Sequence, residues 1–320
     1  MGSLLISGLM ITSLAALAPL NPANSYIGRF APSPTGPLHF GSLVSALASY
    51  LHARIHNGRW LVRMEDLDPP REQAGAADAI LRCLEAHQLH WDGPVLYQSH
   101  RLSAYEEVLE ALREEDLLYA CNCTRQDLQA MGGIYNGRCR NRAVNLDQPH
   151  AWRLKLYDLP PDYVALDNDV RFADLIQGDQ QYNLRLTAGD QILKRKDDLF
   201  AYQLAVVVDD IAQQVTHIIR GNDLLEVTAR QIFFFRLLGA AVPAFGHVPL
   251  VLNEQGQKLS KQNLAAPLDG TNAGNNLWHA LQFLGQNPPL ALIKASATDV
   301  LDWGKVHWRM SHLTPDNRTP

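Results

Sequence analysis

Two short segments, far apart in the sequence, carry side chains suited to nucleotide chemistry. The first is the loop from Arg29 to Gly41, which reads Arg-Phe-Ala-Pro-Ser-Pro-Thr-Gly-Pro-Leu-His-Phe-Gly. Gly41 allows a ligand to approach the backbone, and the N–H groups at a helix start favour phosphate. His39 can donate to a phosphate oxygen that gains charge during a reaction. A His-x-Gly alone is common, so this loop predicts a nucleotide site only together with the second segment.

The second segment is a loop rich in lysine, which reads Lys-Leu-Ser-Lys-Gln from Lys258 to Gln262. Two ammonium groups, on Lys258 and Lys261, flank the hydroxyl of Ser260 and can close over a triphosphate to neutralise its charge in a transition state. Alone, such a loop is more often a solvated surface loop. Its occurrence downstream of the His39 loop favours a joint nucleotide site.

Three of the four cysteines are close in the sequence, at Cys121, Cys123 and Cys139. Thiolates are strong tetrahedral zinc ligands, and two close groups of ligands separated by a loop commonly form such a site. The Cys-x-Cys spacing is tighter than the usual two-residue gap, so reduced, buried cysteines remain the alternative. The cysteines do not form the framework of a secreted disulfide protein, which favours a reducing compartment and a cytoplasmic location.

The sequence alternates between strand and helix patterns, and these elements must position the loops and cysteines described above. A short strand at 26–28 precedes the His39 loop, and a helix is predicted from 42 to 56. The apolar run 60–64 reads as a buried strand that delivers Glu65 at its carboxyl end, where open α/β sheets place ligands. The alternation predicts an α/β fold with a mostly parallel sheet and helices on both faces.

Later segments continue this pattern. The run 199–208 reads as a helix or a buried strand ending at Asp209 and Asp210, to which the sequence assigns no role. We expect a small β-rich insertion between residues 150 and 190, and one helix after the lysine loop. Trp303, His307 and Trp308 resemble an interface stripe. Further predictions are a strand at 215–219 that leads into Arg220, a helix at 225–238, a strand at 248–252 and the C-terminal helix at 277–284.

Composition excludes several classes of function. The chain has 320 residues and a net charge of −5, which neither supports nor excludes an RNA partner. It contains no G-x-S-x-G, Walker or Rossmann G-x-G-x-x-G motif, which argues against a serine hydrolase, a P-loop ATPase and a nicotinamide enzyme. Residues 1–28 lack charged side chains, and Pro19 weakens a membrane span; we expect residues 1–25 to be a dispensable extension and no membrane association.

Together, the His39 loop and the lysine loop resemble the HIGH and KMSKS signatures of class I aminoacyl-tRNA synthetases, and Arg29–Ser33 resembles the glutamyl branch. Ser42 replaces the second His of the first signature, and Gln262 replaces the final Ser of the second. The resemblance implies a Rossmann-like catalytic domain with a zinc-containing insertion and a small connective insertion. The implied domains are an extension (1–25), two catalytic halves (26–118 and 191–262), the zinc module with the connective insertion (119–190) and a short C-terminal region (263–320).

The resemblance also assigns roles to residues. The acid matching Glu65 holds the α-ammonium of glutamate, and Arg29 and Arg220 are partners for its two carboxylates. The residues alone leave open which arginine takes the side-chain carboxylate; the resemblance favours Arg29, with Tyr202 adding a hydrogen bond. The remaining implied residues are Ala31 and Ser33 for glutamate, His39, Gly41, Ser260 and Lys261 for ATP, His39, Lys258 and Lys261 for catalysis, and Tyr135 beside Cys121, Cys123 and Cys139 for a structural zinc.

A full glutamyl enzyme continues into a large helical anticodon-binding region, which residues 263–320 are too few to supply. The chain therefore resembles the shortened branch, whose members use L-glutamate and ATP with Mg²⁺ and transfer the glutamate to queuosine in the anticodon of tRNA(Asp). A monomer is expected. The alternatives are a conventional core that charges the 3′ end of tRNA(Glu), a small-molecule nucleotidyltransferase, or a non-catalytic tRNA- or zinc-binding module.

Overall fold

The computed structural model describes residues 5–6, 9–10, 26–163, 165–253 and 267–315. Its longer helices are α1 (Phe40–Ile55), α2 (Ala76–Ala86), α3 (Leu102–Glu114), α6 (Tyr202–Ala212), α7 (Leu225–Leu237), α8 (Ala273–Phe283) and α9 (Ala297–His307). Two short helices, α4 (Arg125–Ala130) and α5 (Leu184–Thr187), lie in the insertion, and β1 (Leu5–Ile6) and β2 (Leu9–Met10) form a separate short pair.

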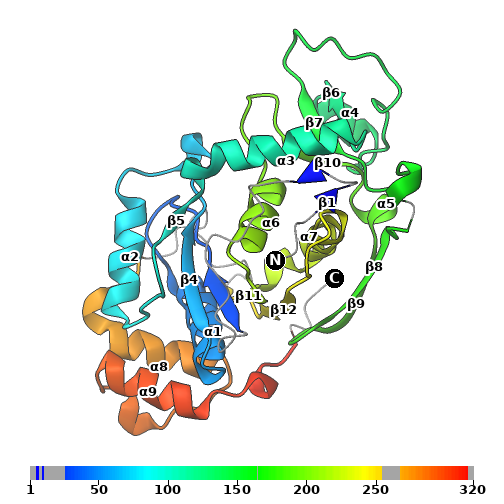
Figure 1. Ribbon diagram of the computed structural model, residues 1–320. Coiled ribbons are helices and arrows are strands. Elements are labelled where there is room, and N and C mark those ends of the chain that lie inside the picture. Colours follow the sequence, from blue (N-terminus) through cyan, green and yellow to red (C-terminus); the bar gives the residue numbers. More distant parts are fainter. Residues whose placement is uncertain (1–4, 7–8, 11–25, 164, 254–266, 316–320) are drawn as a thin grey trace.

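A five-stranded sheet forms the centre of the molecule, in the order β12-β11-β3-β4-β5 (Figure 1). All its neighbouring strands are parallel, as the alternating pattern predicts. Ile218 and Ile219 point to opposite faces of β11, so each joins a different hydrophobic cluster. The strands are β3 (Ile27–Phe30), β4 (Arg59–Met64), β5 (Leu96–Tyr97), β11 (His217–Gly221) and β12 (Ala244–Val248).

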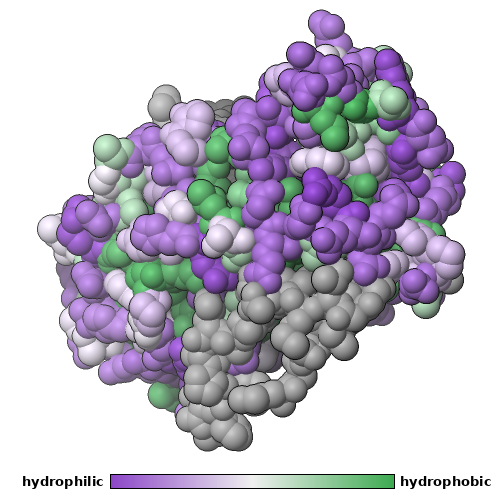
Figure 2. All heavy atoms as spheres, turned by 45° about the horizontal axis from the view of Figure 1, so that its top comes forward, coloured by the Kyte–Doolittle hydropathy of each residue, from purple (hydrophilic) through white to green (hydrophobic). Residues whose placement is uncertain are grey.

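Two hydrophobic clusters cover this sheet. One lies under α1 and includes side chains from α2, α8 and α9, while the other includes side chains from α3, α6 and α7. Helix α1 packs against β3, β4 and β11, so its N-terminus is fixed beside the carboxyl ends of these strands. Hydrophilic residues make up most of the coloured surface in Figure 2. No helix in the described ranges combines the length and hydrophobicity that a bilayer crossing requires.

The central strands β3 and β11 are paired over a very short length. Their ladder contains one residue pair, His217 with Gly28, whereas β11 and β12 pair over five residues and β3 and β4 over four. The carboxyl ends of β3 and β11 therefore diverge, and a space opens between Arg29 and Arg220. Ligands bind at such a point in open α/β sheets, where the strand order reverses.

The insertion between α3 and α6 contains two smaller sheets (Figure 1). One is antiparallel, in the order β10-β7-β6, and the other is a hairpin of β8 and β9. The hairpin lies along α7 and contacts β12, so it reaches the edge of the central sheet. Their strands are β6 (Leu118–Cys121), β7 (Ala151–Leu154), β8 (Asp169–Asp174), β9 (Gly178–Asn183) and β10 (Gln191–Lys194).

Three sequence predictions need correction. The strand expected at 248–252 lies earlier, at Ala244–Val248, because Pro249 lacks an N–H and cannot continue the ladder. A second C-terminal helix, α9, follows α8; its N-cap Ser296 accepts from the N–H of Asp299, a start signal that the sequence analysis missed. Trp308 is buried in the core and is therefore no interface residue. The apolar run at 199–208 proves to belong to a helix, α6.

Candidate active site

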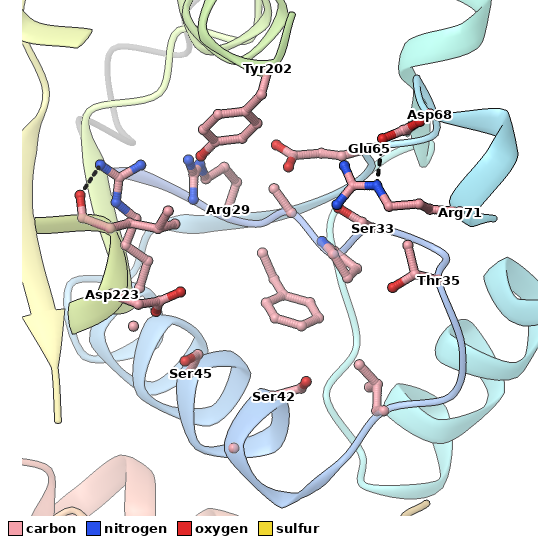
Figure 3. Close-up of a pocket in the computed structure, with 18 of the residues that line it drawn as sticks. Arg29, Ser33, Thr35, Ser42, Ser45, Glu65, Asp68, Arg71, Tyr202 and Asp223 are labelled. Atoms are coloured by element: carbon pink, nitrogen blue, oxygen red, sulfur yellow. Dashed lines mark hydrogen bonds and ion pairs between the residues drawn. The ribbon is translucent and has the colours of Figure 1, made fainter. Parts of the chain in front are cut away.

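A cleft of about 780 Å³ lies at the carboxyl ends of β3, β4 and β11. Figure 3 shows Arg29 and Tyr202 on one side of it, Glu65 and Ser33 beside them, and Ser42 and Ser45 on α1 across the cavity. The cleft brings together eight predicted residues: Arg29, Ala31, Ser33, His39, Gly41, Glu65, Tyr202 and Arg220. Lys258, Ser260 and Lys261 lie outside the described residues, so their roles stay predictions.

His39 is the N-cap of α1. Its Nδ1 accepts a hydrogen bond from the backbone N–H of Ser42, at 3.2 Å. Because Nδ1 accepts, the proton of the neutral ring is on Nε2, which is the nitrogen that can donate. Nε2 lies 3.1 Å from the hydroxyl of Ser42, and both residues line the cleft with the start of the helix, as a phosphate site requires.

Arg29 is held by a buried acid that the sequence analysis left without a role. The Nε of Arg29 lies 3.2 Å from Oδ1 of Asp210, and its Nη2 lies 3.4 Å from Oδ2. Asp210 also pairs with the buried Arg63, at 2.8 Å. Burial alone would raise the pKa of Asp210, but the two guanidinium groups outweigh it and the pKa is lowered. Asp210 is therefore ionised and fixes the plane of Arg29.

The neighbouring acid, Asp209, accepts hydrogen bonds from a different set of side chains. Its carboxylate accepts from Arg101 at 2.9 Å, from Gln98 at 2.9 Å and from Tyr105 at 2.7 Å. These bonds connect α6 to α3 and to the segment before α3. The Asp209–Asp210 pair thus sets the position of α6, whose first residue is Tyr202.

Glu65 directly follows β4, and its carboxylate is not fully hydrogen-bonded within the described residues. Its Oε1 is buried, has no hydrogen bond to the residues that the structure describes, and lies 3.7 Å from Nη2 of Arg63. Burial raises the pKa of Glu65 to about 7, although Arg63 and Arg29 oppose that shift. Burial and then the nearby Glu65 raise the pKa of Tyr202, so its phenol stays protonated and able to donate. A ligand ammonium would supply the hydrogen-bond donor that Oε1 of Glu65 lacks.

Arg220 is buried at the end of β11 with one edge already bonded. Its Nε donates to His247 Nε2 at 3.0 Å, and its Nη2 donates to Thr228 at 2.7 Å and to Gln231 at 2.8 Å. Its Nη1 is buried and has no hydrogen-bond partner among the described residues. An unpaired guanidinium nitrogen beside a cleft is suited to bind a carboxylate.

Polar residues that the sequence analysis did not single out also line the cleft. Arg71 donates to Asp68 at 2.5 Å, and Arg195 lies 3.6 Å from the same carboxylate. These two arginines come from the loop after β4 and the loop after β10 and meet only in the fold. No local motif marks them. They supply positive charge beside the predicted phosphate site.

The cysteine cluster lies apart from the cleft, in the insertion. The sulfurs of Cys121, Cys123 and Cys139 all lie within 4.8 Å of one another, and those of Cys123 and Cys139 are 3.5 Å apart. The hydroxyl of Tyr135 lies 3.4 Å from the sulfur of Cys121 and 3.9 Å from that of Cys123. Gly189 permits this arrangement, since a Cβ there would lie 2.1 Å from the carbonyl oxygen of Tyr135. The cluster can hold a metal ion.

Comparison with known proteins agrees with this geometry. Residues 27–274 match the family described as tRNA synthetases class I (E and Q), catalytic domain. A glutamyl-Q tRNA(Asp) synthetase from Ectopseudomonas mendocina (strain ymp) is 48% identical over 92% of this chain and 97% of its own length. One from Vibrio cholerae (strain ATCC 39315 / El Tor Inaba N16961) is 48% identical over 92% of this chain and 93% of its own.

Solved structures show the same fold. A glutamate tRNA ligase from Elizabethkingia meningosepticum CCUG26117, crystallised in complex with its amino acid, aligns with a TM-score of 0.72 and 25% identity. The alignment covers 91% of this chain and 66% of that ligase, so the chain spans just under two thirds of its length.

The chain therefore belongs to the class I tRNA synthetases of the E and Q type, and among them to the glutamyl-Q tRNA(Asp) synthetases. As a member of this class it is a ligase that uses ATP.

Proposed function

We propose that the cleft activates L-glutamate with ATP and transfers it to queuosine in the anticodon of tRNA(Asp). The observation that carries this proposal is the pair of buried guanidinium groups, Arg29 and Arg220, with Glu65 after the next strand, β4, in the same cleft. A dicarboxylic amino acid has two carboxylates for the arginines and one ammonium for the acid. Glutamine would leave one guanidinium poorly paired, which gives discrimination without editing.

The reaction has two steps. The α-carboxylate of glutamate attacks the α-phosphorus of ATP bound to Mg²⁺, an anhydride bond forms, and pyrophosphate leaves. A hydroxyl of the queuosine then attacks the activated carbonyl, and AMP leaves. The arginines, Glu65 and Tyr202 orient glutamate, and orientation can lower a barrier by about 7–11 kcal/mol in favourable cases. His39 stabilises charge that grows on the phosphate, and we assign Lys258, Ser260 and Lys261 to the same task.

The amino acid is tested by ATP–pyrophosphate exchange with each of the twenty amino acids in turn. We expect exchange with glutamate, without added tRNA. Exchange without any amino acid would instead indicate a small-molecule nucleotidyltransferase, and no exchange at all would indicate a non-catalytic binding module.

The acceptor is tested with radiolabelled glutamate and three RNAs. Queuosine-containing tRNA(Asp) should accept the label at the anticodon, whereas tRNA(Asp) without queuosine and tRNA(Glu) should not. The relatives' names and their near-complete coverage support this acceptor. Label at the 3′ end of tRNA(Glu) would show a conventional synthetase core and contradict the proposal. We further propose a cytoplasmic monomer, which light scattering during size-exclusion chromatography would check.

We also infer that Cys121, Cys123, Tyr135 and Cys139 bind one structural zinc. Zinc–sulfur bonds of about 2.3 Å in a tetrahedron separate the sulfurs by about 3.8 Å, close to the 3.5 Å between Cys123 and Cys139. A fourth ligand from Tyr135 would fill the coordination shell and leave no open position for substrate. The ion would thus tie the loops of the insertion together and take no part in the transfer.

Replacing Cys139 with serine should lower the zinc content from about one ion per chain to well below half of that. We expect a lower melting temperature as well, because metal-binding energy contributes to folding. Mass spectrometry of the metal content and thermal unfolding measure both effects. Cys83→Ser, at the fourth cysteine in α2, is the matched control and should retain the metal. Equal zinc content in both variants would contradict the assignment.

A further inference from the structure

A second layer of buried polar side chains lies behind Arg220, away from the cleft. His247 on β12 and Asp174 at the end of β8 are both fully buried, and their side chains lie 2.5 Å apart, from Nδ1 to Oδ2. The other ring nitrogen of His247 lies 3.0 Å from Nε of Arg220. The three side chains form a line that runs from the insertion hairpin to the cleft.

The chemistry of the two outer groups fixes the state of the histidine between them. An arginine can only donate hydrogen bonds and an ionised carboxylate can only accept them. Nδ1 of His247 must therefore carry the proton that Asp174 accepts, and Nε2 must be the bare nitrogen that accepts from Arg220. Burial lowers the pKa of His247, in keeping with a neutral ring.

Asp174 is itself held firmly in the ionised form. Its Oδ1 accepts from the backbone N–H groups of Ile176, Gln177 and His247, at 3.0, 2.9 and 3.1 Å. The two carboxylate oxygens thus have separate tasks: Oδ1 shapes the turn of the hairpin, and Oδ2 sets the proton of His247. Burial would raise the pKa of Asp174, but His247 and the backbone N–H groups of Gln177 and Ile176 together outweigh it and the pKa is lowered.

We propose that Asp174 and His247 are positioning residues that hold Arg220 so that its Nη1 faces the amino-acid substrate. His247 occupies Nε of Arg220, while Thr228 and Gln231 occupy Nη2, so that within the described part of the chain Nη1 is the nitrogen left for a ligand. The β8–β9 hairpin, which is not part of the catalytic sheet, thereby sets the affinity for the substrate carboxylate. This inference rests on the proposed function, since it concerns the same amino-acid site.

Asp174→Asn tests the proton placement with little change of shape. The asparagine oxygen can still accept from the three backbone groups, but its amide can only donate, so Nδ1 of His247 must become the acceptor. The proton then moves to Nε2 and meets the N–H of Arg220, which places two donors against each other. We expect the KM for glutamate in pyrophosphate exchange to rise about tenfold or more, with the KM for ATP within about twofold of wild type.

Two variants at His247 keep the test decisive if Asp174→Asn fails to fold. His247→Gln can place its oxygen near the position of Nε2 and accept from Arg220, whereas His247→Asn reaches only Asp174. We expect the KM for glutamate to rise about tenfold in His247→Asn and less than about threefold in His247→Gln. A merely structural role would change stability but not separate the two variants. Asp169→Asn, at the half-buried start of the same hairpin, is the control and should behave as wild type.

Two results would overturn the inference: a wild-type KM for glutamate in folded Asp174→Asn, or equal KM values in the two His247 variants. Failure of the proposed function has a different signature. If wild type exchanged with another amino acid and not with glutamate, that function would be wrong. The same variants would then decide the inference through the KM of that amino acid.

Discussion

Replacing Arg29 with methionine should lower kcat/KM for glutamate in pyrophosphate exchange by about 10²–10⁴. A carboxylate that loses two charge-assisted hydrogen bonds, worth about 1.5–3 kcal/mol each, loses about 3–6 kcal/mol of binding. Asp210 contacts the Nε and Nη2 edge of Arg29, so the guanidinium is already oriented before glutamate arrives. Preorganisation of this kind makes the loss large, because little ordering cost offsets it.

The matched control for this variant is Arg101→Met. Arg101 pairs with Asp209, the neighbour of Asp210, but it does not line the cleft. Both variants remove a guanidinium group, buried in Arg29 and half-buried in Arg101, from the same acidic pair, so both should lower stability. Only Arg29→Met should lose glutamate activation. Similar kcat/KM values in the two variants would show that Arg29 acts through folding alone and would contradict its role in binding.

Replacing Glu65 with glutamine should lower kcat/KM for glutamate by about 10–100-fold and change its pH dependence. Glu65 must be ionised to accept from the substrate ammonium, and burial raises its pKa to about 7. For wild type, we therefore expect kcat/KM to fall as the pH drops below about 7. The profile of the variant should lack this inflection, since an amide does not titrate in this range. An inflection that persists in Glu65→Gln would assign it to another group.

The same substitution should stabilise the free protein. The folded pKa of Glu65, about 7, lies above its unfolded value of about 4.3. Its contribution to stability is therefore fully present below pH about 4.3 and lost as the pH rises through about 7. At pH 8, Glu65→Gln removes a buried charge and should raise the free energy of unfolding by up to on the order of 3 kcal/mol. Thermal unfolding at pH 8 and at pH 4 checks this, and the gain should vanish at the lower pH.

The sequence was sufficient to predict the fold class and the assembly of the cleft. Arg29, His39 and Gly41 occur in one continuous motif, and Glu65 follows a clear apolar run. Local sequence patterns were therefore enough to identify these residues. Arg220 follows another strand run. Because carboxyl ends of parallel strands meet at one edge, these residues had to come together once the sheet was parallel. Their roles in binding and catalysis stay predictions, as do the domain limits.

What the sequence could not provide were the contacts across the fold. Asp210 reaches Arg29 and Arg63 from a helix that is distant in the chain, and no spacing rule relates them. A signal was nonetheless present: charged residues interrupt apolar runs at Arg63 and at Asp209–Asp210. A charge within a buried element needs an opposite charge nearby, so such interruptions point to internal ion pairs. The pairing itself required the structure.

The single residue pair between β3 and β11 has a mechanical consequence. The two halves of the sheet meet along a seam that few main-chain bonds close, and Arg29 and Arg220 stand on opposite sides of it. An amino acid bound by both arginines would connect the two halves of the sheet across this seam. We therefore expect saturating glutamate to slow amide hydrogen exchange in both strands together, while ATP alone leaves it unchanged.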